Sequence, residues 1–181
     1  LYSDEGAVVG VLTGAFGVAK DGSHKDSYQP PMELRAKYTL FGEGCRGSLT
    51  KKLEEKLGLR GEADPQTYAI GIKELWEVAP ENHAEGSIVH KIGWPLPKDT
   101  YGGSWLYHME DNLVSLGLVV GLDYRQHSLD VHVLLQKLKR HPLVAPYLKG
   151  GELLEWGAKT IPEGGYYSLP NRMHGDGVLL A

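Results

Sequence analysis

The apolar stretch at residues 113–122 is the feature that most constrains how this chain can fold. It is too short to cross a membrane as a helix, which needs about 20 apolar residues. Its side chains are apolar on both faces, which is typical of a strand in the middle of a sheet. A strand-like segment at 104–109 precedes it, separated by the polar turn at 110–112. The pair predicts a hairpin whose second strand is central in its sheet.

Further strands are predicted at 67–78, 87–94 and 150–161, where apolar residues alternate with polar ones or run between glycine and proline signals. A helix is predicted at 128–140, with Pro142 ending it. The apolar stripe of this helix is formed by Val131, Leu134, Leu135 and Leu138. Together these elements predict an α+β fold, a mostly antiparallel sheet with segregated helices at its ends or on one side.

The first forty residues predict an antiparallel meander. The Asp21-Gly22 dipeptide favours a turn between two short strands. Residues 33–41 are expected to form one strand with a shared face of alternating side chains. That face is made of Leu34, Ala36, Tyr38 and Leu40.

Composition excludes several classes of function. The net charge is −4, which argues against non-specific binding to nucleic acid because such binding needs clustered positive charge. The single cysteine, Cys45, cannot form an internal disulfide and favours a reducing compartment. It also cannot hold a 4Fe-4S cluster, which needs about four cysteine ligands. No histidine spacing typical of zinc is present.

Both ends of the sequence predict a fragment of a longer polypeptide. The chain starts at Leu1 without Met, and it stops in the apolar run 178–181, which is typical of a buried strand. No signal peptide is visible, and no apolar segment is long enough to span a bilayer. Any contact with a membrane is therefore expected to be peripheral.

A glycine-rich loop at 42–48 leads into a short amphipathic helix that Gly58 ends. Ser48 is the expected N-cap of this helix. The free N–H groups of a helix N-terminus suit a phosphate or pyrophosphate, and Arg46 would add further donors. An ordinary strand-to-helix turn that needs glycine for its backbone angles fits the same residues.

A second candidate is the segment 98–108, in which Gly102 and Gly103 stand between aromatic residues. Two adjacent glycines bare the backbone beside apolar walls, as a flat quinone ring with two carbonyls requires. A hairpin turn or bulge with ordinary core aromatics is the alternative. The segment Glu163-Gly164-Gly165, taken alone, predicts a turn.

Longer strings of this sequence resemble one family, the electron transfer flavoprotein:ubiquinone oxidoreductases. The segments that carry the resemblance are Leu-Arg-Ala-Lys-Tyr-Thr-Leu-Phe-Gly-Glu-Gly-Cys-Arg-Gly-Ser at 34–48, Pro-Gln-Thr-Tyr-Ala-Ile-Gly-Ile-Lys-Glu-Leu-Trp at 65–76, Gly-Trp-Pro-Leu at 93–96, Thr-Tyr-Gly-Gly-Ser at 100–104, Leu-Tyr-His at 106–108 and Leu-Gly-Leu-Val-Val-Gly-Leu-Asp-Tyr at 116–124. They occur in the family's order and run over most of the chain.

The resemblance implies the central part of a flavin hydroxylase/reductase-like FAD enzyme. Such an enzyme carries FAD and a 4Fe-4S cluster, takes electrons from reduced electron transfer flavoprotein and passes them to ubiquinone. It implies a peripheral place on the mitochondrial inner membrane, matrix side, or on the bacterial cytoplasmic membrane. The implied domains are a partial FAD-binding domain at 1–60, a quinone-binding domain at 61–165 and a segment at 166–181 that returns to the FAD-binding domain.

The resemblance also implies site residues. The quinone would be met by the backbone of Gly102 and Gly103, with Tyr101 as a neighbouring wall. Glu43 and Gly44 would approach FAD, together with Arg46, where the family often has His. Catalytic residues are not indicated.

The sequence departs from the family in lacking the glycine-rich ADP-binding turn and the cluster cysteines, so this chain alone is expected to be inactive. Two other readings remain open. One is a fragment of a related FAD-dependent reductase (geranylgeranyl reductase-like) or hydroxylase, which shares the loop but not the Thr-Tyr-Gly-Gly-Ser string. The other is a non-catalytic ligand-binding or interaction fragment, whose exposed strand edges could pair with a second copy.

Overall fold

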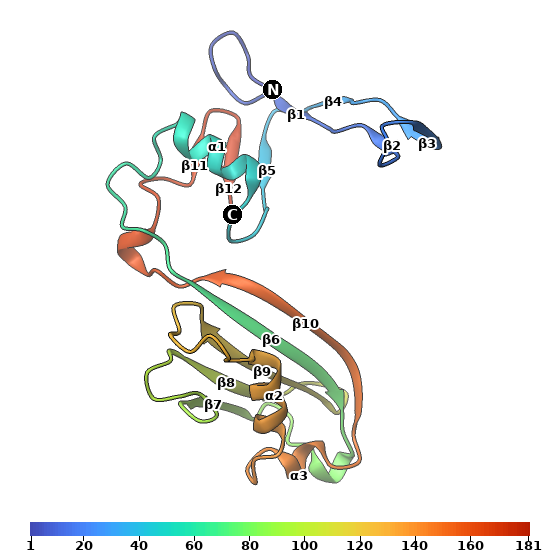
Figure 1. Ribbon diagram of the computed structural model, residues 1–181, viewed down its shortest axis with the longest axis vertical. Helices are drawn as coiled ribbons and strands as arrows, with labels where there is room; N and C mark the ends of the chain where they lie inside the picture. The colour runs from blue at the N-terminus through green and yellow to red at the C-terminus, as the bar shows by residue number, and fades with distance from the viewer. The chain divides into compact units, whose positions relative to one another are not determined.

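The computed structural model describes residues 1–181, which form two compact units. Unit 1 combines Leu1–Ala63 with Leu169–Ala181, and unit 2 is Asp64–Ser168. Figure 1 labels the elements of each unit. The functions predicted for the domains at 1–60, 61–165 and 166–181 remain predictions.

Unit 2 is built on a five-stranded sheet in which every neighbouring pair is antiparallel. Its order is β10-β6-β9-β8-β7, so the apolar strand β9 lies in the centre, as its sequence predicted. The bounds are β6 (Tyr68–Glu77), β7 (Ile88–Ile92), β8 (Gly102–His108), β9 (Leu113–Gly121) and β10 (Glu152–Pro162). The predicted α+β class with a mostly antiparallel sheet is confirmed.

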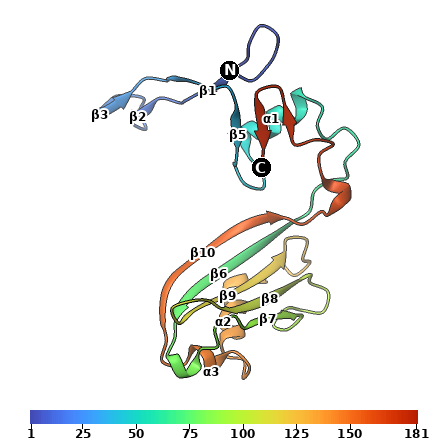
Figure 2. The same ribbon diagram turned by 180° about the vertical axis from the view of Figure 1, so that it is seen from behind.

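One face of this sheet carries the helix α2 (Val131–Lys139). Asp130 caps it by accepting a hydrogen bond from the backbone N–H of Val133 at 3.0 Å. The predicted stripe packs inward, with Leu134, Leu135 and Leu138 buried. It faces a core to which β9 contributes alternate side chains and β8 contributes Leu106. The short elements α3 (Ala145–Leu148), η1 (Pro80–Asn82) and η2 (Tyr166–Ser168) complete unit 2. In Figure 1 the helix lies in front of the strands, and in Figure 2 the strands lie in front of it.

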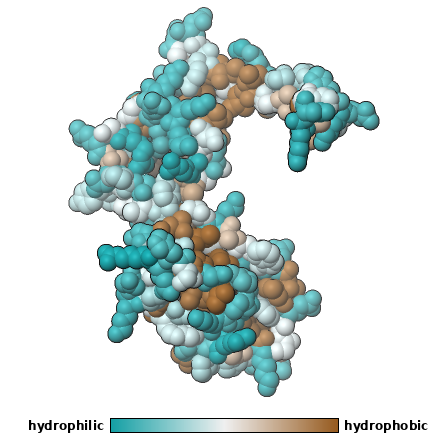
Figure 3. Space-filling model, viewed as in Figure 1, coloured by the Kyte–Doolittle hydropathy of each residue, from teal (hydrophilic) through white to brown (hydrophobic).

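The longest helices have nine residues, and no helix of the chain is long and apolar enough to cross a membrane. Apolar surface is nonetheless present on unit 2, where brown areas interrupt the polar surface in Figure 3.

Unit 1 is held together by a parallel pairing between distant parts of the chain. The strand β12 (Val178–Leu180) pairs with β5 (Thr39–Phe41) and, antiparallel, with β11 (His174–Gly175). The helix α1 (Ser48–Lys56) packs on this sheet. The small core consists of Val8, Phe41, Leu53 and Val178. The apolar run at the end of the sequence is thus a strand with a buried residue, as predicted.

The first forty residues form nested ladders rather than the predicted meander. The outer ladder pairs β1 (Gly10–Leu12) with β4 (Glu33–Arg35). The inner one pairs β2 (Phe16–Val18) with β3 (His24–Gln29). The strand β3 is polar and mostly exposed, so it gave no periodic signal.

The single strand expected at 33–41 is wrong. The chain leaves the β1 ladder after Arg35 and joins β12 from Thr39, so the segment is split between two sheets. Leu34, Tyr38 and Leu40 are exposed, and the buried side chain is Phe41. The alternating side chains are therefore exposed on β4, on β5 and on the link between them, and they do not form the buried face of one strand.

Candidate functional site

Unit 2 contains a pocket of about 820 Å³ beside the start of β8, with walls made mainly of apolar atoms. Strands β7, β8 and β9, the loop between β7 and β8, and the residue after β10 all contribute. Its lining is formed by residues 90–93, residues 97–105, Val119 and Glu163. All three residues predicted to meet a quinone, Tyr101, Gly102 and Gly103, are among them.

Gly102 and Gly103 belong to strand β8 and not to a hairpin turn. Gly102 has a φ of +149°, and a Cβ there would collide with the backbone oxygen of Val119. A Cβ on Gly103 would lie 2.5 Å from the backbone oxygen of Lys91. Both positions therefore require glycine for the close approach of the strands, and the pocket wall here is bare backbone.

Tyr101 stands at the end of the sheet with its ring exposed. Its backbone oxygen accepts a hydrogen bond from the N–H of Gly121 at 2.8 Å, which ties it to the end of β9. Its hydroxyl donates to Oε2 of Glu163 at 3.5 Å. Two ionisable side chains that are 62 residues apart in the sequence thus meet at the pocket.

Sequence reasoning assigned the Glu163 segment to a turn and missed its place in the pocket. The N–H of Glu163 donates to the backbone oxygen of Thr67 at 2.8 Å, and the N–H of Gly164 donates to the side-chain oxygen of Gln66 at 2.6 Å. The long pairing of β10 with β6 brings the segment there. No local pattern could have indicated this.

Trp105 forms a further part of the wall. Its indole N–H donates to Oγ of Ser115 at 3.2 Å, and a Cβ on Gly117 would collide with its ring. These two contacts hold the indole flat on the sheet, where it supplies an aromatic surface to the pocket. Beside it, Nε2 of His90 on the neighbouring strand lies 3.2 Å from the hydroxyl of Tyr107.

The glycine-rich loop of unit 1 does not present a free helix N-terminus. The N-cap of α1 is Gly47, not Ser48 as predicted, and it makes no side-chain capping bond. Glu43 supplies the cap instead: its carboxylate accepts from the N–H of Leu49 at 3.3 Å and from the N–H and hydroxyl of Thr50 at 2.6 and 2.8 Å. The donors that a phosphate would use are therefore occupied by the protein's own carboxylate.

The pKa of Glu43 reflects this contact. Burial alone would raise it, but the hydrogen bonds from Thr50, Leu49 and Ser48 together lower the pKa below its usual value. An ionised carboxylate at a helix N-terminus is also favoured by the helix dipole.

Two of the predicted FAD-binding positions remain accessible. Gly44 has a φ of +79°, with no atom near the place that a Cβ would take. Arg46 is exposed. The loop can thus offer bare backbone and a guanidinium to a dinucleotide, while the Glu43 carboxylate is committed to α1. Whether these residues bind FAD remains a prediction.

The chain does not fit a 4Fe-4S cluster. Cys45 is its one cysteine, and no three His, Cys, Asp or Glu side chains come close enough to hold a metal ion.

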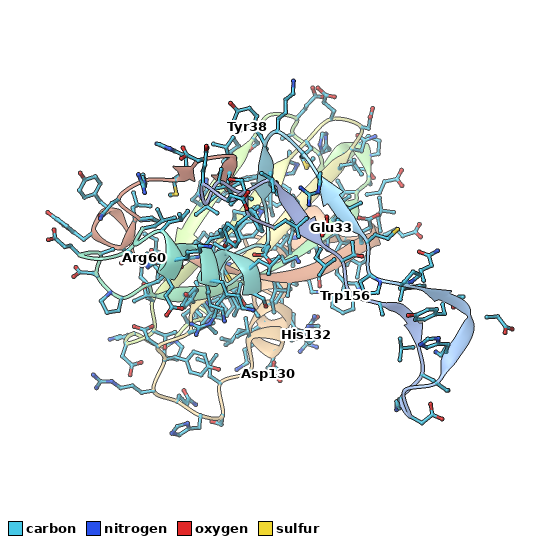
Figure 4. The ribbon with its side chains drawn as sticks, turned by 90° about the horizontal axis from the view of Figure 1, so that it is seen from above. Glu33, Tyr38, Arg60, Asp130, His132 and Trp156 are labelled. Carbon is cyan, nitrogen blue, oxygen red and sulfur yellow. The ribbon has the colours of Figure 1, made fainter.

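A smaller pocket of about 360 Å³ lies between α2 and the edge strand β10. Figure 4 shows His132 on the helix and Trp156 on the strand. The lining of this pocket includes one buried carboxylate, that of Glu74, which is already paired with Lys139 at 2.9 Å. This pocket therefore has no charged group that needs a ligand.

Comparison with known proteins adds the family. The model of the family described as "ETF-QO, ubiquinone-binding" matches residues 68–161, more than half of the chain. The chain belongs to the ETF-QO ubiquinone-binding family. The resemblance found in the sequence is thereby confirmed, and the matched segment contains strands β6 to β9 with most of β10.

Whole-chain relatives agree with this family. The electron transfer flavoprotein-ubiquinone oxidoreductase of Dictyostelium discoideum is 51% identical over 99% of this chain and 30% of its own length. Those of Pseudomonas aeruginosa and Homo sapiens are 46% and 44% identical over 99% of the chain, and 33% and 30% of their own lengths. The chain thus spans about a third of these relatives.

Solved structures share the fold at low identity. A flavin-dependent brominase, Bmp2, in a triple-mutant form, has a TM-score of 0.57 and 16% identity, over 99% of this chain and 41% of its own. A geranylgeranyl bacteriochlorophyll reductase-like protein from Thermoplasma acidophilum has a TM-score of 0.54 and 14% identity, over 92% of this chain and 40% of its own. The fold of this chain therefore occurs within larger proteins.

Proposed function

We propose that the pocket beside β8 binds the ring of ubiquinone. The observation that supports it is the place of Tyr101, Gly102 and Gly103 in an apolar pocket of about 820 Å³, inside the segment that matches the ubiquinone-binding family. The bare backbone of the two glycines would offer hydrogen bonds to a quinone carbonyl, and Trp105 would stack against the ring.

We propose that the chain acts as part of an oxidoreductase of the kind its relatives are named for, which passes electrons from reduced electron transfer flavoprotein to ubiquinone. FAD would supply the two-electron chemistry. Gly44 and Arg46 are the residues of this chain that remain accessible for contact with FAD. The 4Fe-4S cluster of such an enzyme would have its ligands outside these residues.

Electron transfer flavoprotein is the proposed protein partner of the whole enzyme, and nucleic acid is not expected to be one. The proposed location is peripheral, on the mitochondrial inner membrane at its matrix side or on the bacterial cytoplasmic membrane. The net charge of −4 is consistent with the absence of a nucleic-acid partner. Ubiquinone dissolves in the bilayer, so a pocket that takes it up must open near the lipid.

The test is titration of this chain with a short-chain ubiquinone, followed by tryptophan fluorescence and by calorimetry. The variant is Val119→Phe, because Val119 lines the pocket from β9 and is partly exposed, and because Phe is a favoured residue in strands. Glycine variants are unsuitable, since a Cβ on Gly102 or Gly103 would meet backbone atoms of a neighbouring strand. The matched control is Leu75→Phe on β6. Leu75 lies on the same face of the sheet as Val119 but outside the pocket.

The expected result is saturable binding by the unchanged chain and by Leu75→Phe, with affinity reduced about tenfold or more in Val119→Phe because the ring and the new side chain compete for one volume. Equal, non-saturable quenching in all three proteins would reject the pocket.

A further inference from the structure

The pocket has one polar corner in which two ionisable side chains face each other. The hydroxyl of Tyr101 lies 3.5 Å from Oε2 of Glu163, at the long limit of hydrogen bonding. No other hydrogen bond reaches the Glu163 carboxylate. Both groups line the pocket, so each keeps capacity to bond a ligand.

The oxidised and reduced forms of a quinone ring need different hydrogen-bonding partners at these two side chains. The oxygens of the oxidised ring are acceptors only, whereas each hydroxyl of the reduced ring is also a donor. An ionised carboxylate is an acceptor only, and a tyrosine hydroxyl has one donor. Glu163 in its charged form would repel the lone pairs of the oxidised ring and would accept a hydrogen bond from the reduced ring. In its protonated form it would donate to the oxidised ring.

We infer that Glu163 is the residue that gives a proton to the quinone oxygen and then, as a carboxylate, accepts the hydrogen bond of the hydroxyl it has made. This inference rests on the proposed quinone site. Two electrons from a reduced flavin, one proton from the Glu163 carboxyl and one from solvent convert the quinone to the hydroquinone. The O–H bond of Glu163 breaks, a ring O–H bond forms, and water later returns the proton to the carboxylate.

Tyr101 acts in this scheme as a positioning residue. Its hydroxyl lies beside the carboxylate at the pocket edge. Its ring lies against Gly121, where an added Cβ would stand 3.4 Å from it. The backbone bonds of Glu163 and Gly164 to Thr67 and Gln66 hold the other partner. Backbone hydrogen bonds to neighbouring segments therefore hold both Tyr101 and Glu163 in place.

Other titratable groups surround the same pocket and enter the design of the test. They are His90 and Lys91 on β7, Lys98 and Asp99 in the following loop, and Tyr101. Lys91 has its ammonium nitrogen buried without a hydrogen-bond partner. Proton uptake by any of these groups would survive a change at Glu163, which separates their contributions from its own.

The experiment compares the oxidised and reduced forms of one short-chain ubiquinone, titrated without oxygen into the chain, Glu163→Gln and Glu155→Gln. Calorimetry in buffers of different ionisation enthalpy gives both the affinity and the protons taken up per ligand. Glu163→Gln keeps the shape of the side chain and an oxygen that can accept from Tyr101. Glu155 lies on β10, the strand that directly precedes Glu163, and is exposed, so its variant controls for loss of one charge.

The expected result for the chain and for Glu155→Gln is reduced-ring binding about tenfold or more tighter than oxidised-ring binding, the strength of one charge-assisted hydrogen bond. The oxidised ring should be bound with uptake of a proton, and the reduced ring without. Glu163→Gln should bind both forms with similar affinity and lose that uptake.

If the unchanged chain binds both forms equally, or if Glu163→Gln keeps the preference and the uptake, the inference is overturned while the quinone pocket stands. If the unchanged chain binds neither form saturably, the quinone site is rejected and the inference with it.

Discussion

Nζ of Lys139 lies 2.9 Å from Oε1 of Glu74, and this ion pair joins α2 to β6 within unit 2. Glu74 is only 3% exposed. Its second oxygen accepts a hydrogen bond from the indole N–H of Trp76 at 2.8 Å. Both carboxylate oxygens are therefore bonded, and the buried charge has its counterion.

Removal of one partner of this pair should destabilise the chain strongly. Lys139→Met leaves a buried carboxylate without its counterion, which costs about 3–5 kcal/mol in comparable sites. The control is Lys137→Met, an exposed position on the same helix, expected to change the free energy of unfolding by less than about 0.5 kcal/mol. Urea unfolding followed by circular dichroism measures both. Similar midpoints for the two variants would show that the pair contributes little.

A second prediction concerns the glycine beneath Trp105. Gly117→Ala places a methyl group where the indole ring lies, so the ring must move and its bond to Ser115 must lengthen or break. Overpacking of this kind costs about 1–3 kcal/mol. Gly157→Ala is the matched control, because its added Cβ would meet nothing within 4 Å. Unchanged tryptophan fluorescence and an unchanged unfolding midpoint in Gly117→Ala would contradict the packing of Trp105 on Gly117.

Much of unit 2 follows from its sequence because its signals are local. The run of apolar residues in β9 needs cover on both faces, so its central place could be predicted. The stripe of α2 and the end of the helix could be predicted for the same reason. Unit 1 could be predicted less well, because its core depends on the pairing of β12 with β5, between residues far apart in sequence. No pattern of spacing specifies such a contact.

The candidate site shows the same division. The two glycines of β8 and their aromatic neighbours are adjacent in sequence, so their shared environment could be proposed before the fold was known. Glu163 could not, since only the register of β10 on β6 brings it to Tyr101. The role of Glu43 as the cap of α1 also escaped prediction: it lies four positions before Gly47, and a serine directly before the apolar stripe gives the stronger local signal.

The cap of α1 leads to a third prediction. Glu43→Ala removes the acceptor for the N–H groups of Leu49 and Thr50 and should cost about 1 kcal/mol of helix stability. Amide hydrogen exchange should show faster exchange at those two residues and little change in unit 2. Glu55→Ala, at an exposed position of the same helix, is the control. Unaltered protection in Glu43→Ala would mean that the carboxylate does not hold the helix end.

The last prediction concerns pH. The pKa of His108 is lowered from 6.5, first because burial disfavours the charged ring and second because His83 lies nearby. Its ring nitrogen Nδ1 accepts a hydrogen bond from the N–H of Ala84 at 3.1 Å, which the neutral ring can do. The unfolded chain therefore binds more protons than the folded chain below about pH 6.5. The contribution of neutral His108 to stability is fully present above that pH, and it is lost as the pH falls toward the lowered pKa.

Through His108 alone, the free energy of unfolding changes by at most about 1.4 kcal/mol per pH unit. His108→Asn keeps an acceptor for Ala84 but does not titrate, so its free energy of unfolding should change less than that of the unchanged chain between about pH 7.5 and about pH 5.5. His132→Asn, an exposed position on α2, should behave like the unchanged chain. Urea unfolding at the two pH values measures the difference, and an equal loss of stability in all three proteins would assign the pH dependence to other groups.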